Sequence, residues 1–213
     1  MHDVISPFIP FPNIYWWLKV SGAGKICFDG AEHFQKMSYR NRYYITGANG
    51  IITLSIPLQQ GREQRGSMHD VGISYSEHWQ VQHWRTLVSV YNRSPYFQHY
   101  EPSFQKLFET KYDLLHEFNR ASIEWLVQQL RLQVEITTTE IFIRKYSDGY
   151  TDLRNMKPGI EKTPLGHHPY YQLFNERNGF IPNLSMLDLL FAEGPHSMQW
   201  LKNNKDLIAG WGG

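Results

Sequence analysis

Aspartate and histidine side chains at three positions have the chemical types and the neighbours that acid–base catalysis uses. Asp29 follows the apolar run 26–28, and α/β sheets commonly carry site residues directly after a strand. His33 comes four residues later, so the two side chains could form an acid–base pair. His83 lies four residues after Trp79, on the same face of a predicted helix, where it could take a proton from an amine. We take His83, Asp29 and His33 as candidate catalytic residues.

These residues also have structural interpretations, which the sequence leaves open. Asp29 precedes Gly30 and could serve a turn. His83 could be a hydrogen-bonded, half-buried residue of a helix that packs through its tryptophans, as histidines on apolar faces commonly are.

Residues that could hold a ligand are more numerous. Asn41 and Arg42 precede a predicted hairpin, and an arginine fork suits a phosphate or a carboxylate. Arg42 could equally pair with a surface acid. The other candidate binding residues have aromatic, amide or guanidinium side chains suited to a sugar or a nucleotide, and they are Tyr39, Trp79, Arg85, Tyr96, Tyr171 and Gln172.

Signatures of metals and cofactors are missing from the sequence. His167 and His168 are adjacent, so their side chains point in different directions, and no His-Glu-x-x-His pattern occurs. The run Gly22–Lys25 lacks the spacing of a phosphate-binding loop, and Cys27 is the single cysteine. We therefore expect neither a metal site nor a recognisable cofactor.

Composition narrows the class of protein further. The chain has 213 residues and a net charge of +1, which fits one domain and gives no basic excess for nucleic acid. The first seven residues do not form a signal peptide, and no run reaches the roughly 18 apolar residues of a membrane helix. A single cysteine suits a reducing compartment. We expect a cytoplasmic protein that acts on a small molecule.

Short strands and turns in residues 1–75 must position these side chains. Val4 and Ile5 predict a first strand, followed by a proline-rich loop, a helix over 13–19 and a strand over 25–28, in the order of a small parallel βαβ unit. Asn49-Gly50 between two β-branched runs predicts a hairpin with a type I′ turn.

The rest of the chain is predicted to be mostly helical. In 76–133 a helix is expected to start at Ser76, and others to cover 104–110 and 114–130. In 134–213 we expect a strand over 134–143, an irregular stretch over 144–169 and final helices, the first with Ser185 and Asp188 as a capping box. The prediction is one α/β or α+β domain over 1–213, a small mixed sheet with a β-hairpin packed by helices.

Five strings of residues form a recognisable pattern along the chain, and they are Tyr39–Arg42, Trp79–Arg85, Pro95–Phe97, Tyr171–Gln172 and Phe180–Leu190. Together they resemble the WbqC-like family of bacterial proteins, from about Asp3 to Gly194. The last string is the most specific part. Two places differ from longer members, which carry a Gln-Pro-Tyr loop where Ser6-Pro7-Phe8 stands here, and a further α/β segment where 144–169 stands here.

The resemblance implies a cytoplasmic role in O-antigen or other surface-polysaccharide biosynthesis. The expected activity is a transferase that attaches a glycine-like amino acid or another acyl group to the amine of a nucleotide-linked amino sugar. His83 or Asp29 would be the base, and Arg42 and Arg85 would hold phosphate. One alternative is a non-catalytic protein that binds a glycan precursor or a protein partner. Another is a nucleotidyltransferase-like enzyme, although the His-x-Gly-His signature of those enzymes is absent.

Overall fold

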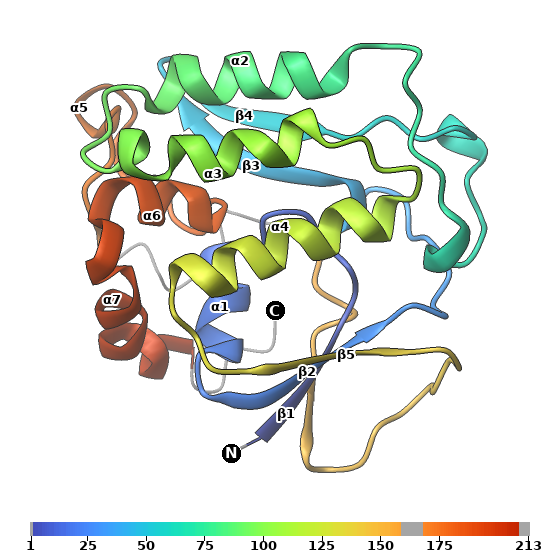
Figure 1. Ribbon diagram of the computed structural model, residues 1–213. Coiled ribbons are helices and arrows are strands. Elements are labelled where there is room, and N and C mark those ends of the chain that lie inside the picture. Colours follow the sequence, from blue (N-terminus) through green and yellow to red (C-terminus); the bar gives the residue numbers. More distant parts are fainter. Residues whose placement is uncertain (1, 159–167, 209–213) are drawn as a thin grey trace.

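The centre of the fold is a parallel sheet with strand order β5-β2-β1-β6 (Figure 1). The computed structural model describes residues 2–158 and 168–208. The four strands are β1 (His2–Ser6), β2 (Ala23–Asp29), β5 (Glu135–Thr139) and β6 (Tyr150–Asp152). Since β1 has β2 on one side and β6 on the other, the strand order reverses at β1, and such points commonly carry ligand sites at the carboxyl ends of the strands.

The predicted βαβ unit is confirmed. Between β1 and β2 lies α1 (Ile14–Val20), whose N-cap Asn13 accepts a hydrogen bond from the backbone N–H of Trp16 at 3.0 Å. β1 and β2 pair in parallel, with Val4 opposite Ile26. The proline-rich loop therefore leaves β1 at the carboxyl edge of the sheet.

A separate antiparallel hairpin is formed by β3 (Arg42–Gly47) and β4 (Gly50–Ser55). The hairpin is confirmed, but the predicted turn type is wrong. Gly47 pairs with Gly50, so Ala48 and Asn49 are the two turn residues, and of these positions only Gly50 has a positive φ, at 100°. A type I′ turn needs positive φ at both central residues.

Three helices cover the hairpin side of the molecule, α2 (Trp79–Tyr91), α3 (Phe97–Glu109) and α4 (Leu115–Gln129) (Figure 1). α2 begins later than predicted, because the Ser76 hydroxyl bonds to Ser74 at 3.0 Å and caps no helix. α3 begins earlier than predicted and accommodates Pro102 inside it. The C-terminal helices are α5 (Asn175–Asn178), α6 (Met186–Glu193) and α7 (Ser197–Asn204).

The region after α4 differs most from expectation. The predicted strand over 134–143 ends at Thr139, and Ile141 to Ile143 are exposed. The stretch over 144–169, predicted to be irregular, contains β6, and its residues 159–167 lie outside the described part of the chain. A three-residue strand paired only to β1 leaves no periodic signal in the sequence. Gly72 and Ile73 make only isolated bridges, to Leu114 and Leu58.

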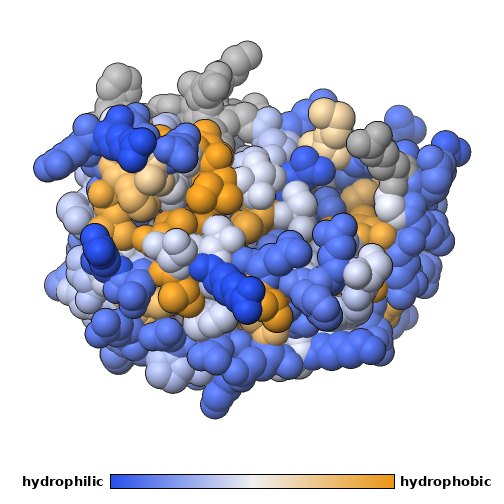
Figure 2. Space-filling model, turned by 90° about the horizontal axis from the view of Figure 1, so that it is seen from above, coloured by the Kyte–Doolittle hydropathy of each residue, from blue (hydrophilic) through white to orange (hydrophobic). Residues whose placement is uncertain are grey.

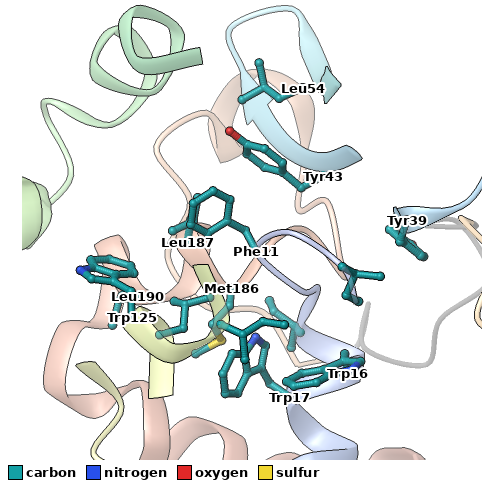
Figure 3. Close-up of a cluster of buried hydrophobic side chains, with 14 of the residues drawn as sticks. Phe11, Trp16, Trp17, Tyr39, Tyr43, Leu54, Trp125, Met186, Leu187 and Leu190 are labelled. Atoms are coloured by element: carbon teal, nitrogen blue, oxygen red, sulfur yellow. The ribbon is translucent and has the colours of Figure 1, made fainter. Parts of the chain in front are cut away.

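Aromatic residues tie these layers together around Phe11 of the proline-rich loop (Figure 3). The Phe11 ring packs edge-on against Tyr43 at 4.9 Å and Phe104 at 5.6 Å between centroids. Phe11 has a φ of 41°, which is uncommon for a bulky residue. Its N–H donates to the Ser122 hydroxyl at 3.1 Å, and its carbonyl accepts from Ser185 at 3.0 Å. The core thereby fixes the loop that carries the chain away from β1.

The outer surface is mostly hydrophilic on the side of α2. Figure 2 shows this face with hydrophobic residues visible between hydrophilic ones, and the exposed apolar side chains include Val81 and Ile51. Single exposed hydrophobic residues are ordinary on protein surfaces. Within the described residues, no helix is long and apolar enough to span a bilayer.

Candidate functional site

Two depressions lie on either side of residues 31–37. The larger, which we call the hairpin hollow, has a volume of about 790 Å³ and is lined by Phe34, Lys36, Met37, Asn41, Arg42, Ser55, Ile56, Pro57, Leu58, Gly61, Ser74, Ser76 and Glu77. The smaller, which we call the carboxyl-edge cleft, has a volume of about 500 Å³ and is lined by Ala31, Glu32, His33, Phe34, Gln35, Phe142, Arg144, Asp152, Arg154 and Asn155. Phe34 lines both.

Residues 31–37 form a wall between the depressions, and hydrogen bonds to residues 66–68 hold it. The N–H of Phe34 donates to the carbonyl of Gly66, and the carbonyl of Glu32 accepts from Met68, both at 2.9 Å. His33 forms an antiparallel bridge with Ser67. Residues 31–35 line the cleft, and Phe34, Lys36 and Met37 line the hollow, so one short segment serves both depressions.

Arg42 is a cation of the hairpin hollow that has no partner among the residues described. It is the first residue of β3, and its Nε atom is buried without a hydrogen-bond partner. Within the described residues, its guanidinium takes part in no ion pair or hydrogen bond. Asn41 beside it donates its side-chain amide to the carbonyl of Ile56 at 2.9 Å. A buried donor without a partner is costly, so a bound anion would stabilise this arrangement.

The rest of the hollow suits a molecule with a charged and an apolar part. Lys36 and Arg42 give two cations against one carboxylate, Glu77. Serine hydroxyls line it, while Phe34 and Met37 supply apolar surface, and the Met37 side chain is 81% exposed. Concave sites with apolar walls and a few polar groups are typical of small-molecule binding. Arg42 and Lys36 favour an anionic ligand such as a phosphate ester.

Arg154 ties together the carboxyl ends of two strands below the cleft. Asp29 ends β2 and accepts from Arg154 Nη1 at 2.8 Å, and Asp152 ends β6 and accepts from Arg154 Nη2 at 2.6 Å. The remaining donors reach Asp152 again and the carbonyls of Ile143 and Arg144. These bonds raise the pKa of Arg154, the one to Asp152 most. All three guanidinium nitrogens are thus occupied by the protein itself.

A second buried ion pair continues this network. Arg40 Nε donates to Glu32 Oε1 at 2.8 Å, and Arg40 Nη2 donates to Glu32 Oε2 at 2.5 Å. Burial raises the pKa of Glu32 more than the bonds from Arg40 lower it. Arg40 also donates to the carbonyl of Arg154 at 3.2 Å. The buried charges of the cleft are therefore paired with one another.

Gly30 follows Asp29 and lies flat against the His69 ring. A Cβ atom at position 30 would overlap that ring, so a larger residue would displace it. The His69 Nε2 atom lies 3.4 Å from the carbonyl of Thr139, at the end of β5. The turn after β2 is therefore shaped by a close backbone approach that only glycine allows.

His33 is exposed on the wall of the cleft, as expected for a reacting group. Its Nδ1 lies 3.0 Å from the carbonyl of Arg65, and since a carbonyl only accepts, Nδ1 carries the hydrogen in the neutral ring. Nε2 is then the nitrogen with a free lone pair. Asp29 bonds to Arg154, Thr139 and the Glu32 N–H, not to His33, so the two predicted partners share one region without pairing.

His83 and Trp79 lie in the core behind the hollow. The His83 ring contacts the Tyr43 hydroxyl at 3.1 Å and the carbonyl of Ser55 at 3.2 Å, so both ring nitrogens have partners. Burial lowers the pKa of His83 to about 4, despite the opposing bond to Ser55. Trp79 packs edge-on against His83, with 5.1 Å between ring centroids. Neither side chain lines the hollow, although His83 supports Ser55, which does.

The other predicted binding residues are dispersed. Tyr39 is buried against Tyr44, Arg85 is exposed on α2, and Tyr96 packs on Gly194. Tyr171 is 55% exposed, away from both depressions, whereas Gln172 is buried.

Gln172 belongs to a cluster around Asp188 that the sequence did not reveal. Asp188 accepts from the Tyr91 hydroxyl at 2.8 Å, the Tyr170 hydroxyl at 2.7 Å and the Gln172 amide at 2.9 Å. Burial raises the pKa of Asp188 to about 6, against the lowering effect of these bonds. The predicted capping box is therefore only half correct. Ser185 caps α6 by accepting from the N–H of Leu187, but the Asp188 carboxylate faces the interior.

Sequence reasoning missed most of the residues that shape the depressions, among them Glu32, Phe34, Arg144 and Arg154. Phe34 and Arg144 lie in segments with no periodic pattern. The Arg154–Asp29 pair joins positions 125 residues apart, and only the order of strands brings them together.

Comparison with known proteins identifies the chain. No curated protein matches it, and no solved structure matches it. The model of the WbqC-like protein family matches residues 7–156, a shorter range than the resemblance suggested, and the string Phe180–Leu190 lies outside it. The matched range contains every residue that lines the hollow and the cleft. The chain belongs to the WbqC-like protein family.

Proposed function

We propose that the hairpin hollow binds the phosphate groups of a nucleotide-linked amino sugar, and that the protein transfers an acyl or aminoacyl group to the amine of that sugar. This would be a cytoplasmic step in the biosynthesis of a bacterial surface polysaccharide. The observation that carries the proposal is Arg42, a guanidinium with a buried, unpartnered Nε beside a hollow of about 790 Å³.

Arg42 is a better phosphate ligand than Arg154 and Arg40. Arg154 donates from all three nitrogens to protein acceptors, and Arg40 binds Glu32 through two nitrogens. Adding an anion there would require breaking bonds to carboxylates, of which Asp29 and Glu32 are buried. Binding at Arg42 breaks no such bond, and Lys36 adds a second positive charge to the same hollow.

The reaction needs an activated acyl donor, which we take to be a thioester. The amine nitrogen forms a bond to the acyl carbon, the bond from that carbon to sulfur breaks, and the amine proton passes through a base to the departing thiolate. Amide and thiol are the products, so no oxidant or reductant is consumed. The site must therefore admit the acyl donor beside the amine of the amino sugar.

A non-catalytic binding protein is the second candidate, and one observation favours it. Asp29 and His83, the residues first assigned to proton transfer, are held by protein groups, and neither lines the hollow. Such a protein would bind a glycan precursor through Arg42 and deliver it unchanged. The parallel β1–α1–β2 unit also fits the nucleotidyltransferase-like alternative, but no residue in it supplies the missing phosphate signature.

A thermal-shift screen tests the proposal. Nucleotide-linked amino sugars, plain nucleotides and coenzyme A are added at millimolar concentration to the parent protein, Arg42→Ala and Arg85→Ala. At 100 times Kd a ligand that binds only the native state adds about 2.7 kcal/mol, a rise in melting temperature of several degrees. We expect the rise to vanish in Arg42→Ala and to persist in Arg85→Ala, whose side chain lies outside the hollow. If no ligand stabilises the parent, the proposal is abandoned.

A further inference from the structure

We infer that the carboxyl-edge cleft holds the sugar end of the ligand whose phosphates occupy the hairpin hollow, and that His33 Nε2 is the base that takes the proton of its amine. This inference rests on the proposed function and deepens it. It assigns a second subsite and a catalytic residue to a cleft at the carboxyl ends of β2 and β6.

The shared wall makes the two depressions parts of one binding surface. Phe34 lines both, so a ligand that leaves the hollow over Phe34 arrives in the cleft. His33 and Phe34 are adjacent, and both are held by the bonds to residues 65–67. A nucleotide-linked amino sugar has its negatively charged phosphates at the middle and a sugar ring without negative charge at one end. The hollow, with its two cations, suits the phosphates, and the adjoining cleft suits the ring.

The chemistry of the cleft suits a sugar better than a second phosphate. Its buried cations Arg154 and Arg40 are already neutralised by Asp29, Asp152 and Glu32. Its walls include the rings of Phe34 and Phe142, which can cover the apolar face of a pyranose. Polar groups remain at the rim to meet hydroxyls, among them the side chains of Gln35, Arg144 and Asn155.

Backbone geometry keeps His33 ready to accept a proton. The carbonyl of Arg65 fixes the hydrogen on Nδ1, which leaves the Nε2 lone pair available on the cleft wall. In the reaction His33 Nε2 would take the proton from the sugar amine as nitrogen bonds to the acyl carbon, and would return it to the departing thiolate. His83, by contrast, has both nitrogens engaged inside the core.

Binding of matched ligands separates this inference from the proposed function. Affinities of a plain nucleoside diphosphate and of the same nucleotide carrying an amino sugar are measured by calorimetry for the parent, Phe142→Ala and Arg42→Ala. We expect the sugar to increase the affinity of the parent about tenfold, which corresponds to one good apolar contact. Phe142→Ala should remove that gain and leave the affinity for the plain nucleotide unchanged. Unchanged nucleotide affinity also shows that the variant is folded.

Other outcomes decide between the two proposals. If Arg42→Ala weakens both ligands and Phe142→Ala weakens neither, the cleft subsite is wrong and the proposed function stands. If the plain nucleotide does not bind the parent protein, the proposed function fails, and this inference fails with it.

The role of His33 has its own test, which needs no acyl donor. In protein labelled with nitrogen-15 histidine, His33→Gln identifies the His33 signals. We expect the Nε2 signal to show that its lone pair accepts a hydrogen bond from the ammonium group when the free-amine ligand binds, and to stay in place with the N-acetylated ligand, which has no basic amine. The same response to both ligands would overturn the assignment of His33 as the base.

Discussion

Arg154 and Arg42 lie on either side of the same wall, yet their guanidinium groups are in opposite states. Arg154 donates to two carboxylates and two carbonyls, so nothing remains for a ligand. Arg42 has a buried Nε with no partner among the described residues. Buried donors are almost always satisfied in folded proteins, so we propose that a ligand is the missing partner of this donor beside the hollow. The comparison teaches that counting donors distinguishes an arginine whose donors are used by the fold from one whose donor is free for the ligand that we propose.

The largest effect on stability is expected from Arg154, the arginine whose donors are all bonded to the protein. Arg154→Ala leaves Asp29 and Asp152 without their cation, and breaking a buried ion pair from one side costs about 3–5 kcal/mol of the free energy of unfolding. Urea denaturation measures it, with Arg42→Ala as the matched control. A loss below about 1 kcal/mol would contradict the structural role assigned to Arg154.

His83 is a histidine in the same state as Arg154, because both of its ring nitrogens have protein partners. Its pKa is lowered from 6.5 to about 4 in the folded protein, so the unfolded chain binds the proton more readily. The stability from neutral His83 is present above pH 6.5 and is lost as the pH falls toward 4, by about 3 kcal/mol. His83→Gln should lose less stability than the parent between pH 7 and pH 4. Parallel urea midpoints for the two proteins across this range would refute the prediction.

Asp188 titrates over a similar range with the opposite sign. Its pKa is raised from 3.8 to about 6, so the folded state holds the proton more strongly. This contribution is present below pH 3.8 and is lost as the pH rises through 6, by about 3 kcal/mol. Asp188→Asn, which cannot ionise, should be destabilised less than the parent by raising the pH from 4 to 7. Chemical denaturation of both proteins at pH 4 and pH 7 measures the stability that each loses. An equal loss in the parent and in Asp188→Asn would refute the prediction.

The smallest effect on stability is expected from Arg42, the arginine without a protein partner among the described residues. Arg42→Ala removes a guanidinium that has no protein partner, so the free energy of unfolding without ligand should change by no more than about 1 kcal/mol. A small gain in stability would fit this expectation as well as a small loss, because the substitution removes a buried donor that has no partner. A loss as large as that of Arg154→Ala would show that Arg42 holds the fold, and the contrast between the two arginines would collapse.

Local signals in the sequence predicted the local structure well. Apolar runs and the Asn49-Gly50 pair located β2 and the hairpin, and helical spacing located α4. Errors arose where a partner far along the chain decides the outcome. β6 has three residues and exists because β1 offers it an edge, so no pattern within 150–152 could reveal it.

The candidate site was predicted in part for the same reason. Asn41 and Arg42 were found from their place before a hairpin, and both line the hollow. The sequence also placed Asp29 and His33 in one region, but it could not show that Arg154 lies between the carboxylates. Which donors are satisfied is a property of the assembled fold, and the sequence alone cannot report it.

The contact between Gly30 and the His69 ring has a consequence for the evolution of the family. A Cβ at position 30 has no room while the imidazole stands there, so a larger residue at position 30 requires the side chain at position 69 to move or to become smaller. Relatives with alanine in place of Gly30 should carry a smaller side chain in place of His69, and the two alignment columns should covary. A substitution introduced at position 30 alone would be expected to revert, or to select its compensating partner at position 69.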